Sequence, residues 1–391
     1  MKILWVSPFL PHPGAGHAGG RALYQWVAGS ARAHDVTLVC RLDPREEAYA
    51  DSLRPLLRGL HLQTFSRPPA NVLQTASIAA SYVRLGRFAG RLLGAERFDL
   101  VHVDYLESAI ALGGRRRRVP RLAVAIDELG KPARRRYELA SGAARTRAWL
   151  RWRATIAMQR RVCRRLDRIL TLSEQDRRAL LVLNPDLPVG VLPFPVGIET
   201  DRIDDAAREG NHLLFVGAMN RDVNADAVIH FCREILPLVR KEAPAVRLTI
   251  AGAAPIDSVQ RLAREPGVEV TGFVDRLEPY YERATLLVSP LRVGGGIISK
   301  NLDAMAAGCP VVTTSIGNEG IGATPGTELL TADTPIDFAA AVLSILRNGE
   351  VGRRLAHAAR AFVRARYSVE ASLAALEREH ETLAARAGVR L

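Results

Sequence analysis

Cysteine is scarce in this chain, with four in 391 residues. No two of them form a CxxC pair or have the spacing of metal ligands. This distribution excludes a disulfide scaffold and a cysteine-ligated zinc module, and it is typical of a protein from a reducing compartment. The four cysteines are Cys40, Cys163, Cys232 and Cys309.

Long apolar runs are also missing. No window reaches about 18 uninterrupted apolar residues, so we expect no membrane-spanning helix. The opening "MKILWVSPFL" begins like a secretory signal, but Pro8, Pro11 and Pro13 interrupt it and no small-residue cleavage site follows. We therefore expect a cytoplasmic protein, at most peripheral on the cytoplasmic face of the membrane.

Aromatic residues make up only 6% of the chain and do not interleave with its arginines. Stacking platforms for bases are therefore lacking, which argues against a nucleic-acid partner. The net charge of +13 is uneven: residues 1–200 hold 32 Lys and Arg against 17 Asp and Glu, whereas residues 201–391 hold 22 against 24. The basic first half indicates either an arginine-rich composition alone or attraction to an anionic membrane or phosphorylated acceptor.

Short apolar runs alternate with helix-like segments along the whole chain. In the first half the expected strands are 2–8, 35–40, 98–105, 121–127 and 168–174, and in the second 212–220, 247–252, 268–274, 284–290 and 310–315. Such alternation predicts parallel sheets covered by helices on both faces. The predicted fold class is α/β, with two doubly wound Rossmann-like domains that face each other across a cleft.

The predicted domains are an N-terminal domain at 1–195, a linker at 196–210 and a C-terminal domain at 211–367. The amphipathic helix predicted at 368–391 would pack back on the first domain. Ligands bind at the carboxyl ends of the strands in such sheets.

A glycine-rich turn follows the strand expected at 284–290. Without side chains, its backbone N–H groups can approach a ligand closely, and the helix expected from Ile298 to Ala307 would direct its N-terminus at phosphate oxygens. Gly308 would end that helix. The turn consists of Gly294, Gly295 and Gly296.

Two charged residues follow the turn on one helix face. Lys300 would bind phosphate, and Asp303 could accept hydrogen bonds from the two hydroxyls of a ribose. The pattern thus predicts a nucleoside diphosphate site. The alternative is a flexible turn with a surface ion pair.

Four segments of the chain together resemble a GT-B glycosyltransferase of the family 4 type. They are "HLLFVGAMNRDVNADAVIHF", "TGFVDRLEPYYERATLLVSP", "VGGGIISKNLDAMAAGCPVVTTSIGNEGI" and, in the first half, "LTLSEQDRRAL". The resemblance implies that the second domain binds a nucleotide-sugar and the first an acceptor. It also implies transfer with retention of anomeric configuration, without a metal ion or other cofactor.

The chain departs from that family in the donor motif. The family usually has two glutamates eight residues apart, and these positions are Gly295 and Asp303 here. The carboxylate often credited with holding the donor sugar is therefore absent, and which sugar is bound cannot be read from the motif.

Further donor-site residues follow from the resemblance. In "FVGAMNR", Gly217 begins the turn and Arg221 is the candidate phosphate-binding cation, with Arg292 as another. Asn224 is expected to be the N-cap of the next helix. In the first domain, Gly19 and Gly20 match the family's glycine loop, which approaches the diphosphate.

The resemblance also directs attention to the strand ends of the first domain. His102 or Asp104 would face the donor sugar, with His102 as a catalytic candidate, and Asp127 and Glu128 could meet acceptor hydroxyls. Arg221 and Lys300 would stabilise the leaving diphosphate. The predicted function is a retaining hexosyltransferase that uses a UDP- or GDP-sugar, in glycan or glycoconjugate biosynthesis. A sugar-nucleotide epimerase and a catalytically silent nucleotide-sugar-binding protein remain as alternatives.

Overall fold

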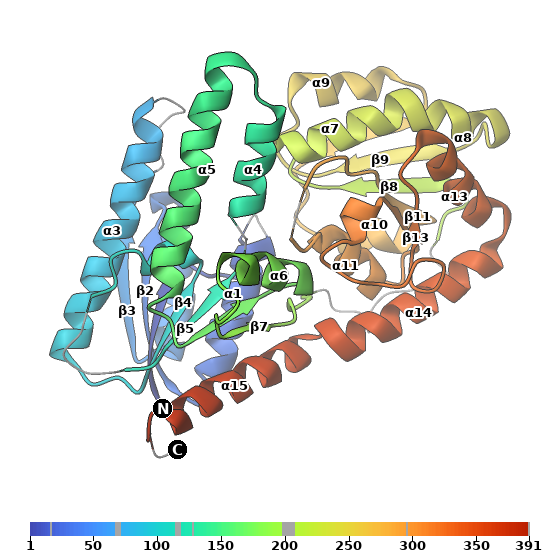
Figure 1. Cartoon of the computed structure of the whole chain (residues 1–391). Coiled ribbons are helices and arrows are strands. Elements are labelled where there is room, and N and C mark those ends of the chain that lie inside the picture. The colour runs from blue at the N-terminus through green and yellow to red at the C-terminus, as the bar shows by residue number, and fades with distance from the viewer. Residues whose placement is uncertain are drawn as a thin grey trace. The chain divides into compact units, whose positions relative to one another are not determined.

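The computed structural model describes residues 1–15, 18–66, 72–113, 119–126, 129–197, 208–294 and 296–389. The chain divides into two compact units. Unit 1 contains Met1–Pro195 together with Val369–Leu391, and unit 2 contains Val196–Ser368. In Figure 1 each unit has strands at its centre and helices around them.

Unit 1 is built on a parallel sheet of seven strands, in the order β3-β2-β1-β4-β5-β6-β7. The chain moves outward in one direction from β1 to β3, and β4 then begins on the other side of β1, which makes the sheet doubly wound. Its strands are β1 (Lys2–Ser7), β2 (Asp35–Leu42), β3 (Gly59–Thr64), β4 (Leu100–Asp104), β5 (Arg121–Ala125), β6 (Arg168–Thr171) and β7 (Val189–Val191).

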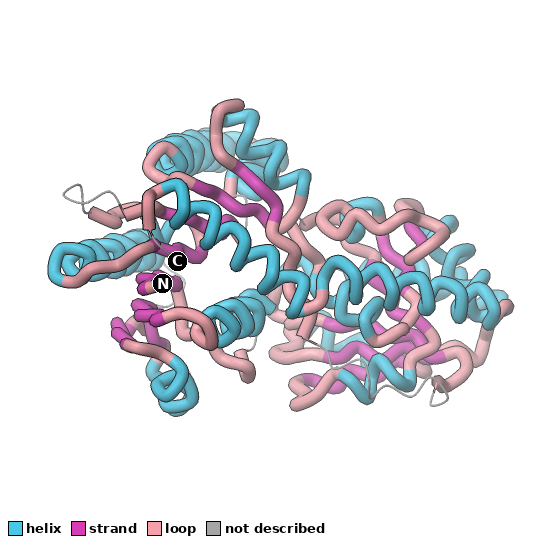
Figure 2. The backbone as a smooth tube through the Cα atoms, turned by 90° about the horizontal axis from the view of Figure 1, so that it is seen from below, coloured by secondary structure: helices cyan, strands magenta, loops and turns pink. Residues whose placement is uncertain are grey.

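Helices cover both faces of this sheet, as the tube view in Figure 2 also shows. They are α1 (Ala18–Ser30), α2 (Glu47–Leu53), α3 (Val72–Ala95), α4 (Gly130–Leu139), α5 (Gly142–Cys163), α6 (Glu174–Leu183) and α15 (Val369–Arg386). The last helix returns to unit 1 from the far end of the sequence and packs on α1.

Successive side chains of a strand point to opposite faces of the sheet, so neighbouring residues of one strand contact different helices. In β4, Val101 and Val103 belong to the apolar cluster that includes residues of α3 and α5. His102 lies between them and points to the opposite face, where it meets His380 of α15. The same face carries Trp5, which is paired with His102 in the register of β1 and β4.

Unit 2 repeats the architecture with a parallel sheet of six strands, in the order β10-β9-β8-β11-β12-β13. Its apolar cluster is centred on β8, β9 and β11. The strands are β8 (His212–Val216), β9 (Arg247–Ala251), β10 (Val268–Gly272), β11 (Leu286–Ser289), β12 (Val311–Thr313) and β13 (Leu330–Thr331).

The helical segment after β8 is divided by a π-helical turn at Phe231–Ile235. Pro237 follows that turn, and it lacks the backbone N–H that a continuous α-helix would direct at the carbonyl of Arg233. The helices of unit 2 are α7 (Asp222–His230), α8 (Leu236–Glu242), α9 (Asp257–Gln260), α10 (Glu278–Arg283), α11 (Ser299–Ala306), α12 (Ser315–Asn318), α13 (Pro335–Arg347) and α14 (Gly349–Tyr367).

The predicted fold class is confirmed, since both sheets are parallel and doubly wound. The strand pattern missed β3, β7 and β13. All three are edge strands, and β7 and β13 are only three and two residues long. No helix among the described residues is long and apolar enough to cross a bilayer.

Candidate active site

The strand order of unit 2 reverses between β8 and β11. From β8 the chain continues to β9 on one side, whereas β11 lies on the other side of β8 and continues to β12. The segments that leave the carboxyl ends of these two strands are therefore neighbours, at the position where doubly wound sheets bind ligands. Most of the donor-binding residues predicted from the sequence lie in these two segments.

Lys300 lies in the first turn of α11, and its ammonium reaches back toward β8. Its Nζ donates a hydrogen bond to Asn224 Oδ1 over 2.7 Å and lies 4.3 Å from the centroid of the Phe215 ring. Burial and, to a smaller extent, the positive charge of Arg221 together lower the pKa of Lys300 to about 7. Two cations therefore converge here, and an arriving anion would be attracted to both.

Glycines make room for this arrangement. A Cβ on Gly217 would lie 2.7 Å from Asn224 Nδ2 and 3.0 Å from Lys300 Nζ. A Cβ on Gly252, whose φ is +147°, would lie 1.9 Å from the carbonyl oxygen of Gly217. A side chain at Gly217 would displace the ends of Asn224 and Lys300, and one at Gly252 would collide with the backbone of Gly217. Glycine at both positions therefore helps to hold Lys300 where it is.

The predicted glycine turn adopts backbone conformations that favour glycine. Gly294 has φ 156° and Gly296 has φ 71°, whereas Gly295 lies outside the described residues. Gly296 is buried, and a Cβ on Gly320 would approach its carbonyl oxygen to 2.2 Å. One end of the turn thus packs against the segment after β12, while Gly294 remains partly exposed.

The helix after the turn ends as predicted. Gly308 has φ 65°, its N–H donates to Met305, and the N–H of Cys309 donates to Ala304 over 2.8 Å, which is a Schellman motif. Asp303 lies in this helix and is 8% exposed. Its binding of a ribose stays a prediction.

Asn224 is not the N-cap of α7, so that prediction was wrong. The cap is Arg221, and Asn224 lies within the first turn of the helix. Its Nδ2 donates to the carbonyl of Ala218 over 2.9 Å, which leaves Oδ1 to accept from Lys300. No local sequence pattern indicates this positioning role, because the two residues are far apart along the chain.

The two predicted phosphate-binding arginines differ in their surroundings. Arg221 is exposed beside Lys300. Arg292 forms a bidentate ion pair with Asp226, with Nε 3.0 Å from Oδ2, and this contact raises the pKa of the guanidinium. The charge of Arg292 is therefore already compensated, and its binding of phosphate stays a prediction.

In unit 1, Gly19 and Gly20 do not lie in a loop. Both belong to the first turn of α1, so the predicted glycine loop is wrong at these positions. The helix follows β1 along the chain, and the strand order of this sheet reverses between β1 and β4. Their approach to a diphosphate stays a prediction.

His102 and Asp104 lie inside unit 1 and have no exposed surface. The His102 ring stacks on Trp5 with centroids 3.7 Å apart, and its Nε2 lies 3.2 Å from Asp104 Oδ1. Trp5 Nε1 donates to Asp104 Oδ2 over 2.7 Å. These contacts hold the core together and give neither side chain access to a ligand in this conformation, so their roles toward sugar and acceptor stay predictions.

Burial changes the protonation of this pair. It lowers the pKa of His102 to about 3 and raises that of Asp104 to about 8, an effect that the hydrogen bond from Trp5 reduces. At neutral pH the imidazole is therefore uncharged, and the carboxyl is mostly protonated. Asp127 and Glu128 lie outside the described residues.

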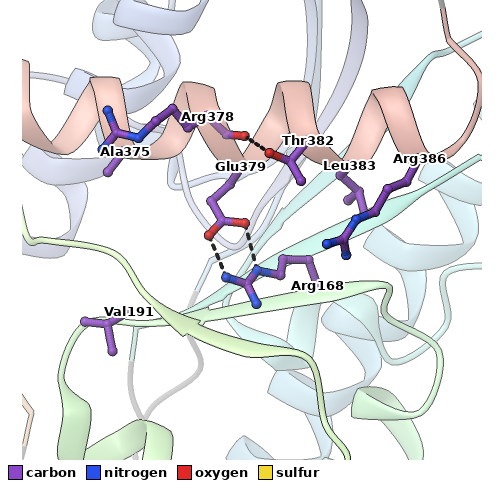
Figure 3. Close-up of a pocket in the computed structure, with 8 residues that line it drawn as sticks. All are labelled: Arg168, Val191, Ala375, Arg378, Glu379, Thr382, Leu383 and Arg386. Atoms are coloured by element: carbon purple, nitrogen blue, oxygen red, sulfur yellow. Dashed lines mark hydrogen bonds and ion pairs between the residues drawn. The ribbon is translucent and has the colours of Figure 1, made fainter.

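A pocket of about 320 Å³ lies elsewhere in unit 1, between α15 and the strands β6 and β7 (Figure 3). Arg168 binds Glu379 with two hydrogen bonds of 2.7 and 2.6 Å and so ties β6 to α15. None of the predicted site residues lines this pocket.

Comparison with known proteins decides the family. The model of the family described as "Glycosyl transferase 4-like domain" matches residues 18–195, and the model described as "Glycosyl transferases group 1" matches residues 210–348. The chain belongs to the group 1, family-4-like glycosyltransferases. The resemblance found in the sequence is thus confirmed.

Solved structures show that this glycosyltransferase has the GT-B fold. A sucrose-phosphate synthase from Thermosynechococcus elongatus superposes with a TM-score of 0.74 at 18% identity, over 99% of this chain and 100% of that one. Anabaena HepE in complex with UDP-glucose superposes with a TM-score of 0.62 at 15% identity, over 98% and 100% of the two chains. At such identities the likeness shows the fold alone.

One curated relative is similar in sequence. It is an uncharacterized 44.6 kDa protein in the cps region of Klebsiella pneumoniae, 28% identical over 177 residues. The matched part is 43% of this glycosyltransferase and 46% of that relative, so it spans about half of either chain.

Proposed function

We propose that this glycosyltransferase transfers a sugar from a UDP- or GDP-sugar to an acceptor hydroxyl, with retention of configuration and without a metal ion. The observation that carries the proposal is the pair of cations, Lys300 and Arg221, at the strand reversal of unit 2. The family and the UDP-glucose complex of HepE support a nucleotide-sugar as the donor.

The chemistry follows from where charge develops. As the bond between the anomeric carbon and the β-phosphate oxygen breaks, negative charge grows on the departing diphosphate. Lys300, Arg221 and the N-terminus of α11 would stabilise that charge. Loss of one such preorganised donor typically costs about 3–4 kcal/mol, or about 10²–10³ in rate.

The proton of the acceptor hydroxyl needs a base. The side chains of His102 and Asp104 are buried away from solvent, so the departing phosphate itself is the proposed base, with Asp127 or Glu128 as the group that orients the acceptor. Asp303 is the proposed ligand of the ribose, and Gly294 would bring its backbone N–H to the diphosphate. The N–H of Gly217 already donates to the carbonyl of Ala251, so Gly217 would contribute by leaving space for the diphosphate.

A lipid-linked or phosphorylated acceptor is the second part of the proposal. The arginine-rich helix α5 exposes Trp149 and Leu150, at 42% and 56%, beside arginines that include Arg151 and Arg153. Apolar anchors beside cations are typical of segments that lie on anionic bilayers. The match to a protein of a cps region is consistent with a role in glycan biosynthesis.

The test is release of nucleoside diphosphate from a panel of UDP- and GDP-sugars, with and without lipid extract as acceptor. Turnover of one donor with the anomeric configuration retained in the product supports the proposal. Conversion of one donor sugar into its epimer would indicate the epimerase instead. Binding of a donor without any turnover would favour the silent binding protein, for which the missing glutamate at Gly295 is the main argument.

A further inference from the structure

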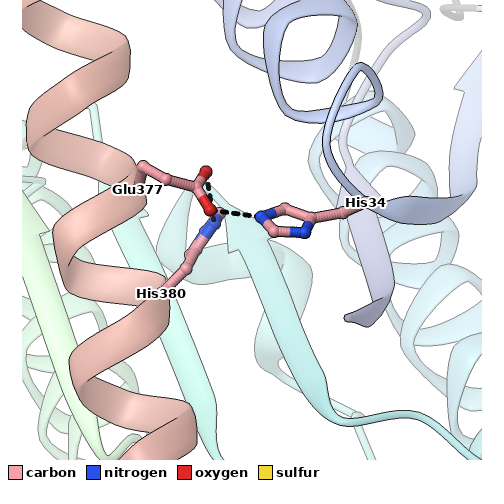
Figure 4. Close-up of side chains that lie close together, drawn as sticks. All are labelled: His34, Glu377 and His380. Atoms are coloured by element: carbon pink, nitrogen blue, oxygen red, sulfur yellow. Dashed lines mark hydrogen bonds and ion pairs between the residues drawn. The ribbon is translucent and has the colours of Figure 1, made fainter. Parts of the chain in front are cut away.

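Three potential metal ligands of unit 1 lie close together outside the proposed donor site. They are His34, which follows α1, and Glu377 and His380 of α15. The side chains point toward one another in Figure 4, and one ligand atom of each lies within 4.8 Å of the other two. Glu377 and His380 are three residues apart and therefore share one face of the helix.

The contacts inside this group leave one buried nitrogen without a partner. His34 Nε2 is hydrogen-bonded to Glu377 Oε1. His380 is fully buried, and its Nδ1 has no hydrogen-bond partner among the described residues. That nitrogen lies 4.0 Å from Glu377 Oε2, which is too far for a hydrogen bond. A polar atom so placed costs free energy unless something fills the gap.

A metal ion has the right size for this gap. Zn²⁺ binds imidazole nitrogen at about 2.0–2.1 Å and carboxylate oxygen at about 2.0–2.2 Å. One ion between His380 Nδ1 and Glu377 Oε2 can therefore span 4.0 Å with little movement of either side chain. Two imidazoles and a carboxylate are also a ligand set that zinc uses in proteins.

The surroundings of His380 resemble those of metal-binding imidazoles. Its other nitrogen, Nε2, lies 2.9 Å from His102 Nδ1, and His102 Nε2 in turn lies 3.2 Å from Asp104 Oδ1. Hydrogen bonds from the second nitrogen to a further polar group fix the ring orientation of such ligands. His380 is thus held with Nδ1 directed at Glu377.

We propose that His34, Glu377 and His380 bind one divalent transition-metal cation, with Zn²⁺ as the best match, and that this cation fastens α15 to α1 within unit 1. α15 joins unit 1 only after the chain has completed unit 2, so a bond of this kind would secure the last element to be added. The proposed role is structural and is independent of the sugar transfer.

The experiment uses the full chain without a polyhistidine tag, freed of metal by chelation. Co²⁺ serves as the spectroscopic probe, and Zn²⁺ is then added as competitor. The wild type is expected to bind one Co²⁺ with visible d–d absorption that Zn²⁺ removes. His34→Gln and Glu377→Gln are each expected to weaken binding by about 100-fold or more, and Zn²⁺ should raise the unfolding temperature of the wild type but not of these variants.

His230→Gln is the matched control. His230 is 10% exposed, as His34 is, and its Nδ1 lies 3.1 Å from Glu234, but this pair is not part of any described metal-ligand group of three. This variant is expected to bind Co²⁺ as the wild type does. Unfolding curves without metal show that each variant is folded. If wild type shows no Co²⁺ bands, or both cluster variants bind as tightly as the wild type, the three residues form a hydrogen-bonded cluster only and the proposal is overturned.

Discussion

Lys300 Nζ donates a hydrogen bond to Asn224 Oδ1 over 2.7 Å, and this contact joins the first turn of α11 to the first turn of α7. An uncharged amide holds the ammonium without neutralising it. The cation is thus positioned and partly desolvated before any ligand arrives, which is the condition for strong electrostatic stabilisation of a leaving group.

Nucleotide affinity should depend on pH through Lys300. Its pKa is about 7 in the free protein, and a bound diphosphate would raise it, so that binding takes up a proton above pH 7. Titration of UDP or GDP by calorimetry between pH 7.5 and 9.5 should show affinity falling by up to about tenfold per pH unit, with proton uptake. Affinity that is independent of pH in this range would contradict the assignment.

Gly217→Ala should displace Lys300. The new Cβ would lie 2.7 Å from Asn224 Nδ2 and 3.0 Å from Lys300 Nζ, so the hydrogen bond between them cannot persist. We expect donor turnover to fall about 10-fold or more. Gly94→Ala is the control, because nothing lies within 4 Å of its Cβ and it is in helix α3, where alanine is favoured. Equal turnover by both variants would show that Gly217 does not position Lys300.

The stability of unit 1 should depend on Trp5. Its Nε1 donates to Asp104 and its ring stacks on His102. Trp5→Phe removes the donor and leaves the Asp104 oxygen unpaired, which should lower the free energy of unfolding by about 2 kcal/mol. Denaturant titration measures it, with Trp149→Phe, at a residue 42% exposed, as the control that should change little. A loss no larger than in the control would show that the contact contributes no stability.

Acid should destabilise the same core through His102. Its pKa in the folded protein is about 3, below the value near 6.5 in the unfolded chain, so the unfolded state binds more protons between these limits. Stability from this group is present above pH 6.5 and declines toward pH 3 by up to about 1.4 kcal/mol per pH unit. Asp104 beside His102 acts in the opposite direction, because burial raises its pKa to about 8 and the folded state then binds more protons than the unfolded chain. The contribution of His102 is therefore isolated by comparing unfolding free energies at pH 7 and pH 5 in the wild type and in His102→Gln. From pH 7 to pH 5 the change should be less favourable to folding in the wild type than in this variant, and equal changes would contradict the assignment.

Local sequence patterns predicted those helices and strands that are defined by apolar residues close together in the sequence. The strands β8 to β12 were found from their short apolar runs, and so was the helix stop at Gly308. The strand β3 was missed because its residues are only partly buried and it begins with glycine.

The site was predicted only where its residues are close together in the sequence. Lys300 and the glycine turn lie on one segment, but Asn224 approaches Lys300 from 76 residues away. His102 was expected near a ligand because the family resemblance directs attention to the strand ends of the first domain. The pattern could not show that α15, 278 residues later, covers it with His380. Long-range pairing of this kind leaves no periodic signal.

Membrane contact is tested on helix α5. The double variant Trp149→Ser and Leu150→Ser should reduce sedimentation with anionic vesicles by about tenfold, because it removes exposed apolar anchors beside the arginines. Ile336→Ser, at a residue 73% exposed in α13 of unit 2, is the control. Equal binding by the double variant and the control would exclude α5 as the docking surface.

The most direct test of the account is the rate of nucleoside diphosphate release by Lys300→Met with the best donor of the panel. Methionine keeps the length of the side chain and removes the charge. We predict a loss of about 10²–10³ in rate, and stability at pH 6 no lower than that of the wild type, because a partly desolvated cation is removed. Release at the wild-type rate by a folded Lys300→Met protein would contradict the proposed role of this cation.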